Sequence, residues 1–109
     1  MLAMFPFARG TTAKKRPVVV VQADSYNLSM HNAVVAEISG NTVRATDSAH
    51  QLIDISTHDG RATGLLRNSV VSCLNLATLH EHRLERVIGE FSASLMEQVD
   101  ECLKSALGL

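Results

Sequence analysis

Three consecutive cations, Lys14, Lys15 and Arg16, stand directly before Pro17 and a run of four valines at residues 18–21. Because proline restricts the residue before it to an extended backbone, Arg16 is expected to be held in a fixed place at the entrance of a strand. A guanidinium group there can donate two hydrogen bonds to one phosphate. The residues leave two interpretations open: a phosphate-binding arginine, or a strand entrance whose charges are simply solvated.

A hydroxyl group is expected near this arginine. A second β-branched segment, residues 33–38, is followed by Ser39 and Gly40. If this segment pairs antiparallel with residues 17–22, then Ser39 at its far end comes close to Arg16. Gly40 allows another part of the chain to approach the backbone closely. An arginine, a hydroxyl and a glycine-flanked loop are groups that phosphate chemistry uses.

The other reactive side chains form no motif with a known spacing. His31, His50 and His58 stand in polar segments; each could act as a general base, but surface positions are the expectation. Cys73 and Cys102 have apolar neighbours and are expected to be buried free thiols in a reducing compartment. Because the histidines and cysteines lack metal-ligand spacing, we expect no metal and no cofactor.

The first three quarters of the chain are predicted to be β-structure. Since proline has no N–H, Pro17 is expected to start its strand, and Asp59-Gly60 is expected to form a tight turn. Short segments spaced about a dozen residues apart favour a small antiparallel sheet or barrel over parallel units. The predicted strands are 17–22, 33–38, 51–56, 69–74 and 85–91.

The last quarter is predicted to hold the helical structure. A capping-box pattern at residues 78–81 predicts one short helical turn. Ser92 or Ser94 can cap a terminal helix whose apolar residues recur at helical spacing up to Gly108. Residues 1–109 are therefore expected to form a single domain, mainly β with a C-terminal amphipathic helix lying across the sheet.

Charge is distributed unevenly along the 109 residues. The formal net charge is −1, but residues 1–78 carry +2 and residues 79–109 carry −3. The longest apolar run, residues 18–21, is too short to span a bilayer, so a membrane protein is excluded and a cytoplasmic location is expected. The neutral total argues against a protein that coats long nucleic acids and favours short single strands and a neutralising protein partner.

Five segments of the chain together match the pattern of a known family: residues 15–24, 33–39, 68–71, 83–89 and 99–109. In this order and spacing they resemble the MazF/PemK toxins of bacterial toxin–antitoxin systems. The resemblance implies a compact SH3-like antiparallel barrel, as also found in CcdB toxins, with a C-terminal helix. It also implies a homodimer, a cognate antitoxin, and a metal-independent, sequence-selective endoribonuclease that cleaves single-stranded RNA, including mRNA, to inhibit growth.

The resemblance also assigns roles to residues. It implies that Arg16 stabilises the scissile phosphate and that Ser39 donates a hydrogen bond to it. Arg67 is a secondary catalytic candidate, because Arg67-Asn68-Ser69 holds the arginine of a family motif but has Ser69 where the motif has an acid. The general base is left open. Residues expected to contact RNA are Arg9, Lys14, Lys15 and Asn27.

Two alternatives to the endoribonuclease stay open, and a departure from the family pattern motivates the first of them. Residues 1–7 supply only a shortened first strand. The chain could therefore be a catalytically decayed member that binds RNA without cleaving it. It could also be a CcdB-like toxin that binds gyrase through its C-terminal helix, in which case toxicity would survive Arg16→Ala.

Overall fold

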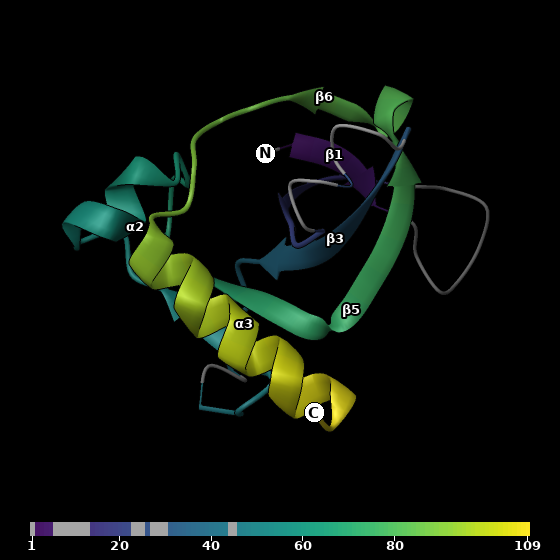
Figure 1. Ribbon diagram of the computed structural model, residues 1–109. Coiled ribbons are helices and arrows are strands. Elements are labelled where there is room, and N and C mark those ends of the chain that lie inside the picture. Colours follow the sequence, from purple (N-terminus) through teal and green to yellow (C-terminus); the bar gives the residue numbers. More distant parts are fainter. Residues whose placement is uncertain (1, 6–13, 23–25, 27–30, 44–45) are drawn as a thin grey trace.

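The computed structural model describes residues 2–5, 14–22, 26, 31–43 and 46–109. Over these residues the chain forms a six-stranded antiparallel sheet in the order β4-β5-β3-β2-β1-β6, which curves into a barrel-like shape (Figure 1). The expected mainly β fold with a C-terminal helix is confirmed. The strands are β1 (Leu2–Phe5), β2 (Lys14–Val20), β3 (Asn32–Ser39), β4 (His50–Ile53), β5 (Ser69–His80) and β6 (Leu84–Arg86), and the helices are α2 (His58–Ala62), α3 (Ala93–Leu107) and a 3₁₀ helix (Glu81–Arg83).

Pro17 lies inside β2, so the expectation that it starts the strand is wrong. β2 pairs with β1 from Lys14 to Pro17, and its pairing with β3 runs from Val18 to Val20. Pro17 therefore occupies the point where β2 passes from one neighbour to the other. A residue without an N–H is tolerated there because it interrupts neither ladder in its middle.

A bulge divides β5 into two parts. Ala36 of β3 pairs with Leu76, whereas the next residue, Glu37, pairs with Ser72, so residues 73–75 have no register partner on β3. β5 bends sharply in its middle (Figure 1). It continues as a strand to His80, and the expected helical turn is found slightly later, as the 3₁₀ helix.

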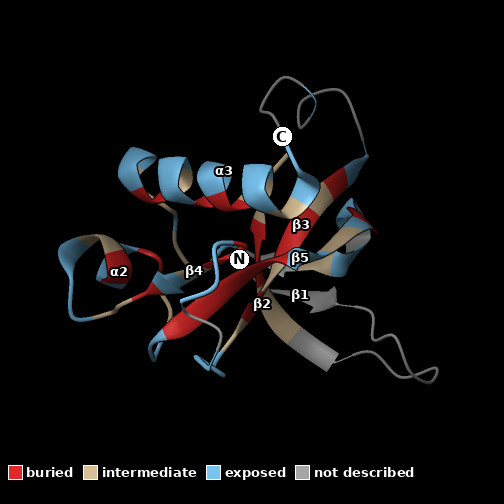
Figure 2. Cartoon of the chain, turned by 90° about the horizontal axis from the view of Figure 1, so that it is seen from below, coloured by how far each residue is buried: buried red, intermediate tan, exposed pale blue. Residues whose placement is uncertain are grey.

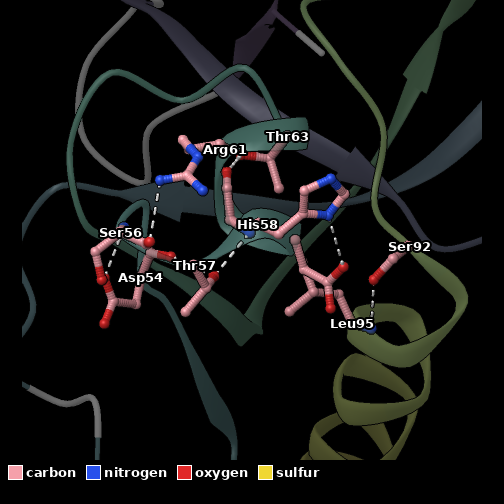
Figure 3. Close-up of polar contacts among 10 residues, drawn as sticks. Asp54, Ser56, Thr57, His58, Arg61, Thr63, Ser92 and Leu95 are labelled. Carbon is pink, nitrogen blue, oxygen red and sulfur yellow. Dashed lines mark hydrogen bonds and ion pairs between the residues drawn. The ribbon is translucent and has the colours of Figure 1, made fainter.

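Residues 58–62 form the short helix α2 where a tight Asp-Gly turn was expected. Figure 3 shows the contacts that begin it: the Thr57 hydroxyl accepts a hydrogen bond from the Gly60 N–H at 2.9 Å and donates one to the Asp54 carbonyl at 2.7 Å. A Cβ atom on Gly60 would overlap that carbonyl. The glycine is thus required for close packing within a helix, not for a turn. Two other strands are shorter than expected, since β4 ends at Ile53 and β6 at Arg86.

α3 is the expected terminal helix. Ser92, one of the two predicted caps, accepts a hydrogen bond from the Leu95 N–H at 3.1 Å, and Gly108 ends the helix with φ 72°. The buried stripe of α3 faces the sheet, and its other face is exposed (Figure 2). Leu95, Val99 and Cys102 form this stripe, and each large apolar side chain buried in this way stabilises the fold by about 2 kcal/mol.

The two faces of the sheet carry different cores. Val19 and its neighbours on β3, β4 and β5 pack against α3. Val18, one residue earlier, points to the opposite face because side chains alternate along a strand. There it packs with Ala33, Val35 and Leu79. Farther along this second face, towards the end of β3, the side chains become polar.

Cys73 and Cys102 are free and buried, as expected. Burial raises the pKa of the Cys73 thiol to about 11 and raises that of Cys102 as well. The fold therefore stabilises the neutral thiols. This contribution to stability is complete below the ordinary thiol pKa and is lost as the pH rises towards about 11.

We expect Cys73 to react with iodoacetamide at pH 8 at least about 100-fold more slowly in the folded protein than in urea, since far less thiolate is present and the sulfur is enclosed. Mass spectrometry of timed samples measures both rates. Similar rates in the two states would show that the thiol is not protected by folding.

Candidate active site

Arg16 and Ser39 come from neighbouring strands. The last pair of the β2–β3 ladder is Val18 with Glu37, and Arg16 and Ser39 each lie two residues beyond this pair, so that their side chains are on the same face as Val18 and Glu37. Ser39 is the last residue of β3. The antiparallel pairing on which the sequence argument depended is therefore present, and it brings the guanidinium and the hydroxyl to the same end of β3.

Glu37 pairs with Arg16 and was missed by the sequence reasoning. Arg16 Nη1 lies 3.4 Å from Glu37 Oε1, with side chains that are 31% and 14% exposed. A partly buried carboxylate at this distance orients the guanidinium and restrains it on the sheet. The one signal available was an acidic residue within an otherwise apolar segment, Ala33 to Ile38.

The Ser39 hydroxyl has a defined role in the loop after β3. It accepts a hydrogen bond from the Asn41 N–H at 3.1 Å. Because it acts as acceptor in this contact, its own hydrogen can be donated to another group, such as a phosphate oxygen.

Arg67 also lies at this end of β3. A Cβ atom on Gly40 would overlap the Arg67 guanidinium, so the absence of a side chain at Gly40 lets Arg67 lie against the backbone next to Ser39. The neighbours of Arg67 have structural contacts: Asn68 Oδ1 accepts from the Ile55 N–H at 2.9 Å, and the Ser69 hydroxyl donates to the Arg67 carbonyl at 2.9 Å. Neither Asn68 nor Ser69 supplies the acid that the family motif has two residues after the arginine.

A pocket of about 270 Å³ opens beside Ser39 on this face. Its polar lining includes Glu37, Ser39, His50, Ser72 and Asn75. His50 is buried, so the expectation that it lies on the surface is wrong, whereas the side chains of His31 and His58 are 81% and 94% exposed. Ser72 was missed, and His50, considered as one of three possible general bases, was not placed beside it, because only the pairing of β4 with β5 brings the two together.

The remaining predicted RNA contacts are only partly described. Lys14 and Lys15 lie in β2 opposite Phe5 and Met4 of β1, whereas Arg9 and Asn27 lie outside the described residues. Within the described ranges, no group of three His, Cys, Asp or Glu side chains is arranged to hold a metal ion. Of the helices in those ranges, none is long and apolar enough to cross a membrane.

A small barrel-like sheet crossed by one C-terminal helix is also the fold of a class of solved toxin structures. A solved structure of this class is the Mycobacterium tuberculosis toxin MazF-mt6, with a TM-score of 0.75, 26% identity, and coverage of 99% of this chain and 96% of that one. The chain belongs to the family described as PemK-like, MazF-like toxin of type II toxin–antitoxin system, which it matches over residues 1–107.

Two further relatives extend the comparison. The endoribonuclease MazF6 of Mycobacterium tuberculosis is 38% identical over 98 residues, which cover 89% of this chain and 82% of the relative. A mycobacterial endoribonuclease solved in complex with its cognate antitoxin shares the fold, with a TM-score of 0.74, 21% identity, and coverage of 99% of this chain and 91% of that one. The suspected MazF/PemK resemblance is thereby confirmed.

Proposed function

We propose that this toxin is an endoribonuclease that cleaves single-stranded RNA, including mRNA, at preferred sequences and without a metal ion, and so inhibits growth. The observation that carries the proposal is that Arg16 and Ser39 both lie two residues beyond the last pair of the β2–β3 ladder, on the same face of the sheet. The family assignment and the 38% identical endoribonuclease support it.

The reaction follows from the groups at this site. The ribose 2′-hydroxyl attacks the adjacent phosphorus, and the bond to the 5′-oxygen breaks, which leaves a 2′,3′-cyclic phosphate and a 5′-hydroxyl. Negative charge grows on the phosphate oxygens during this step. Arg16 stabilises that charge, and Ser39 donates a hydrogen bond to it.

Arg67 and the basic residues around β2 have supporting roles in the proposal. Arg67, held against Gly40, adds a second positive charge next to the scissile phosphate. Flanking phosphates and bases of the single strand contact the remaining predicted residues, which are Arg9, Lys14, Lys15 and Asn27.

The test is to incubate the purified protein with a long unstructured RNA in EDTA and to map both new ends. We expect cuts at a short recurring sequence, with a 2′,3′-cyclic phosphate on one side and a 5′-hydroxyl on the other. Intact RNA would contradict the proposed activity. Cleavage that requires an added divalent cation would contradict the metal-free reaction.

The proposal includes a homodimer in the cytoplasm and a cognate antitoxin. An acidic antitoxin segment that crosses Lys14, Lys15 and Arg16 would match the local charge. We expect the affinity of such a segment to fall by roughly tenfold or more as salt rises from 50 to 500 mM, because exposed charges are screened. Titration calorimetry with a peptide from the antitoxin encoded beside this gene measures it, and a salt-independent affinity would contradict this contact.

A further inference from the structure

The pocket beside Ser39 contains a row of three polar side chains on three neighbouring strands. Glu37 of β3 pairs with Ser72 of β5, and Ser72 pairs with His50 of β4. Ser72 Oγ lies 3.1 Å from His50 Nε2. All three side chains line the pocket that Ser39 also lines.

The Asp47 carboxylate lies next to the His50 imidazole, on the side away from Ser72. Asp47 Oδ1 lies 3.5 Å from His50 Nδ1, and the His50 side chain is only 7% exposed. The Ala49 N–H donates to the same carboxylate oxygen at 2.8 Å, which fixes its position. His50 Nδ1 is buried and has no hydrogen-bond partner among the described residues, so Asp47 is a neighbouring charge, and the hydrogen bond that leads into the pocket is the one between His50 and Ser72.

The contact between Ser72 and His50 fits either imidazole tautomer. The Asp47 carboxylate, 3.5 Å from Nδ1, favours the tautomer with its hydrogen on Nδ1, and we assign Nε2 as the acceptor on that basis. The Ser72 hydroxyl then donates to Nε2, and its oxygen lone pairs are left to accept a hydrogen bond from a group in the pocket. A ribose hydroxyl is such a donor, whereas a phosphate oxygen is not.

We propose, on the basis of the endoribonuclease function above, that Ser72 and His50 remove the proton of the attacking hydroxyl. The 2′-hydroxyl proton passes to Ser72 Oγ while the Ser72 proton passes to His50 Nε2. The 2′-oxygen forms its bond to phosphorus, and the 5′-oxygen leaves and takes a proton from water. Ser72 is the catalytic group in contact with the substrate, and His50 acts through it as a positioning residue and proton acceptor.

Several titratable groups lie around His50. Asp47 approaches it from the preceding loop, and Glu37 of β3 lines the same pocket, with its charge opposed by Arg16 of β2. From α3, the neighbour of Asp47 is Cys102, whose thiol is neutral because burial raises its pKa. Asp47 is therefore the carboxylate placed to stabilise positive charge that forms on the imidazole.

The test is the pH dependence of single-turnover RNA cleavage from pH 5 to 9. The wild-type rate should fall as the pH is lowered, and this acid limb reflects the loss of the proton acceptor, because a protonated imidazole cannot accept a proton. Ser72→Ala and His50→Gln should each lower kcat by about 100-fold with little change in KM, and both should lose this limb. The double variant should be no slower than the slower single variant, because the two residues act as one unit.

Matched controls separate this role from a general loss of folding. His58→Gln, at an exposed histidine on α2, and Ser94→Ala, at an exposed serine on α3, should keep the wild-type rate and profile. Binding of an RNA with a 2′-deoxy group at the cleavage site should be unchanged in Ser72→Ala. A Ser72→Ala variant that keeps the acid limb and cleaves RNA at a rate within about 3-fold of wild type would contradict the proposed proton transfer through Ser72 to His50.

A substrate with sulfur in place of the bridging 5′-oxygen tests the direction of the proton transfer in the wild-type protein itself. A thiolate leaving group needs no proton. The fall in rate at low pH should therefore persist with this substrate if Ser72 and His50 take the proton from the 2′-hydroxyl. Rescue of His50→Gln by this substrate would assign His50 to the leaving group and overturn the proposal. If the wild-type protein leaves RNA intact, both the proposed endoribonuclease function and the proton transfer through Ser72 and His50 are contradicted. If the wild-type protein cleaves RNA, the variants test the proton transfer alone.

Discussion

Replacing Arg16 with alanine is expected to slow cleavage of single-stranded RNA by at least about 100-fold, because the charge that develops on the phosphate loses its main partner. The loss should be found mostly in kcat, since the interaction strengthens as the transition state forms. The cleavage rate of Arg16→Lys should be intermediate, because an ammonium group keeps the positive charge but cannot form bidentate hydrogen bonds to the phosphate. Single-turnover cleavage of a short RNA that contains one mapped site measures all three proteins.

The controls for this prediction follow from the neighbours of Arg16. Removing it leaves the partly buried Glu37 without its 3.4 Å ion pair, which by itself destabilises the sheet. Arg16→Ala should therefore also be measured together with Glu37→Gln, which removes the unpaired charge. Arg83→Ala changes an exposed arginine in the 3₁₀ helix, near the opposite end of β3 from Ser39, and should keep full activity. Equal cleavage by wild type and Arg16→Ala would remove Arg16 from the mechanism.

Replacing Gly64 with alanine is expected to lower the free energy of unfolding by about 3 kcal/mol, the largest stability effect that we predict for a single methyl group. Gly64 has φ +81°, which disfavours any side chain, and a Cβ atom there would overlap the Ile88 carbonyl. That carbonyl belongs to the segment between β6 and α3, which packs against the end of α2: the Glu90 N–H donates to the Ala62 carbonyl at 3.2 Å. The segment around Gly64 and the segment that contains Ile88 would have to move apart to make room for the methyl group.

Gly108 provides a matched control for this effect. It also has positive φ, +72°, but a Cβ atom there has no neighbour within 4 Å. Gly108→Ala should therefore show only the conformational cost, about 1 kcal/mol. Urea unfolding followed by circular dichroism measures both variants, and equal losses at the two positions would show that the contact with Ile88 is not tight.

Elements whose signals are local could be predicted from the sequence. β3 follows from its β-branched residues, and α3 follows from the helical spacing of its apolar residues between Ser92 and Gly108. α2 could not, because Asp59-Gly60 is a turn signal in isolation and becomes helical only when Thr57 caps it. The position of Pro17 within β2 depends on a change of neighbouring strand, which the residues around it do not encode.

The same distinction applies to the candidate site. Arg16 and Ser39 could be related in advance because one antiparallel pairing is enough to bring them together. Glu37, Ser72 and His50 depend on three strands and on the bulge that shifts the β3–β5 register after Ala36. Such a row cannot be read from spacing along the chain, since a shift of one residue would turn each side chain to the other face.

The bulge in β5 also bears on how the site can change during evolution. Leu74 and Asn75 are exposed within it, and Asn75 lines the pocket. The registers on both sides are held by separate cores, one against α3 and one around Val18. Substitutions, and even an inserted residue, at positions 74 and 75 would alter the wall of the pocket while both cores keep their packing. The bulge is thus a place where the selectivity of the toxin can diverge at little cost to its fold.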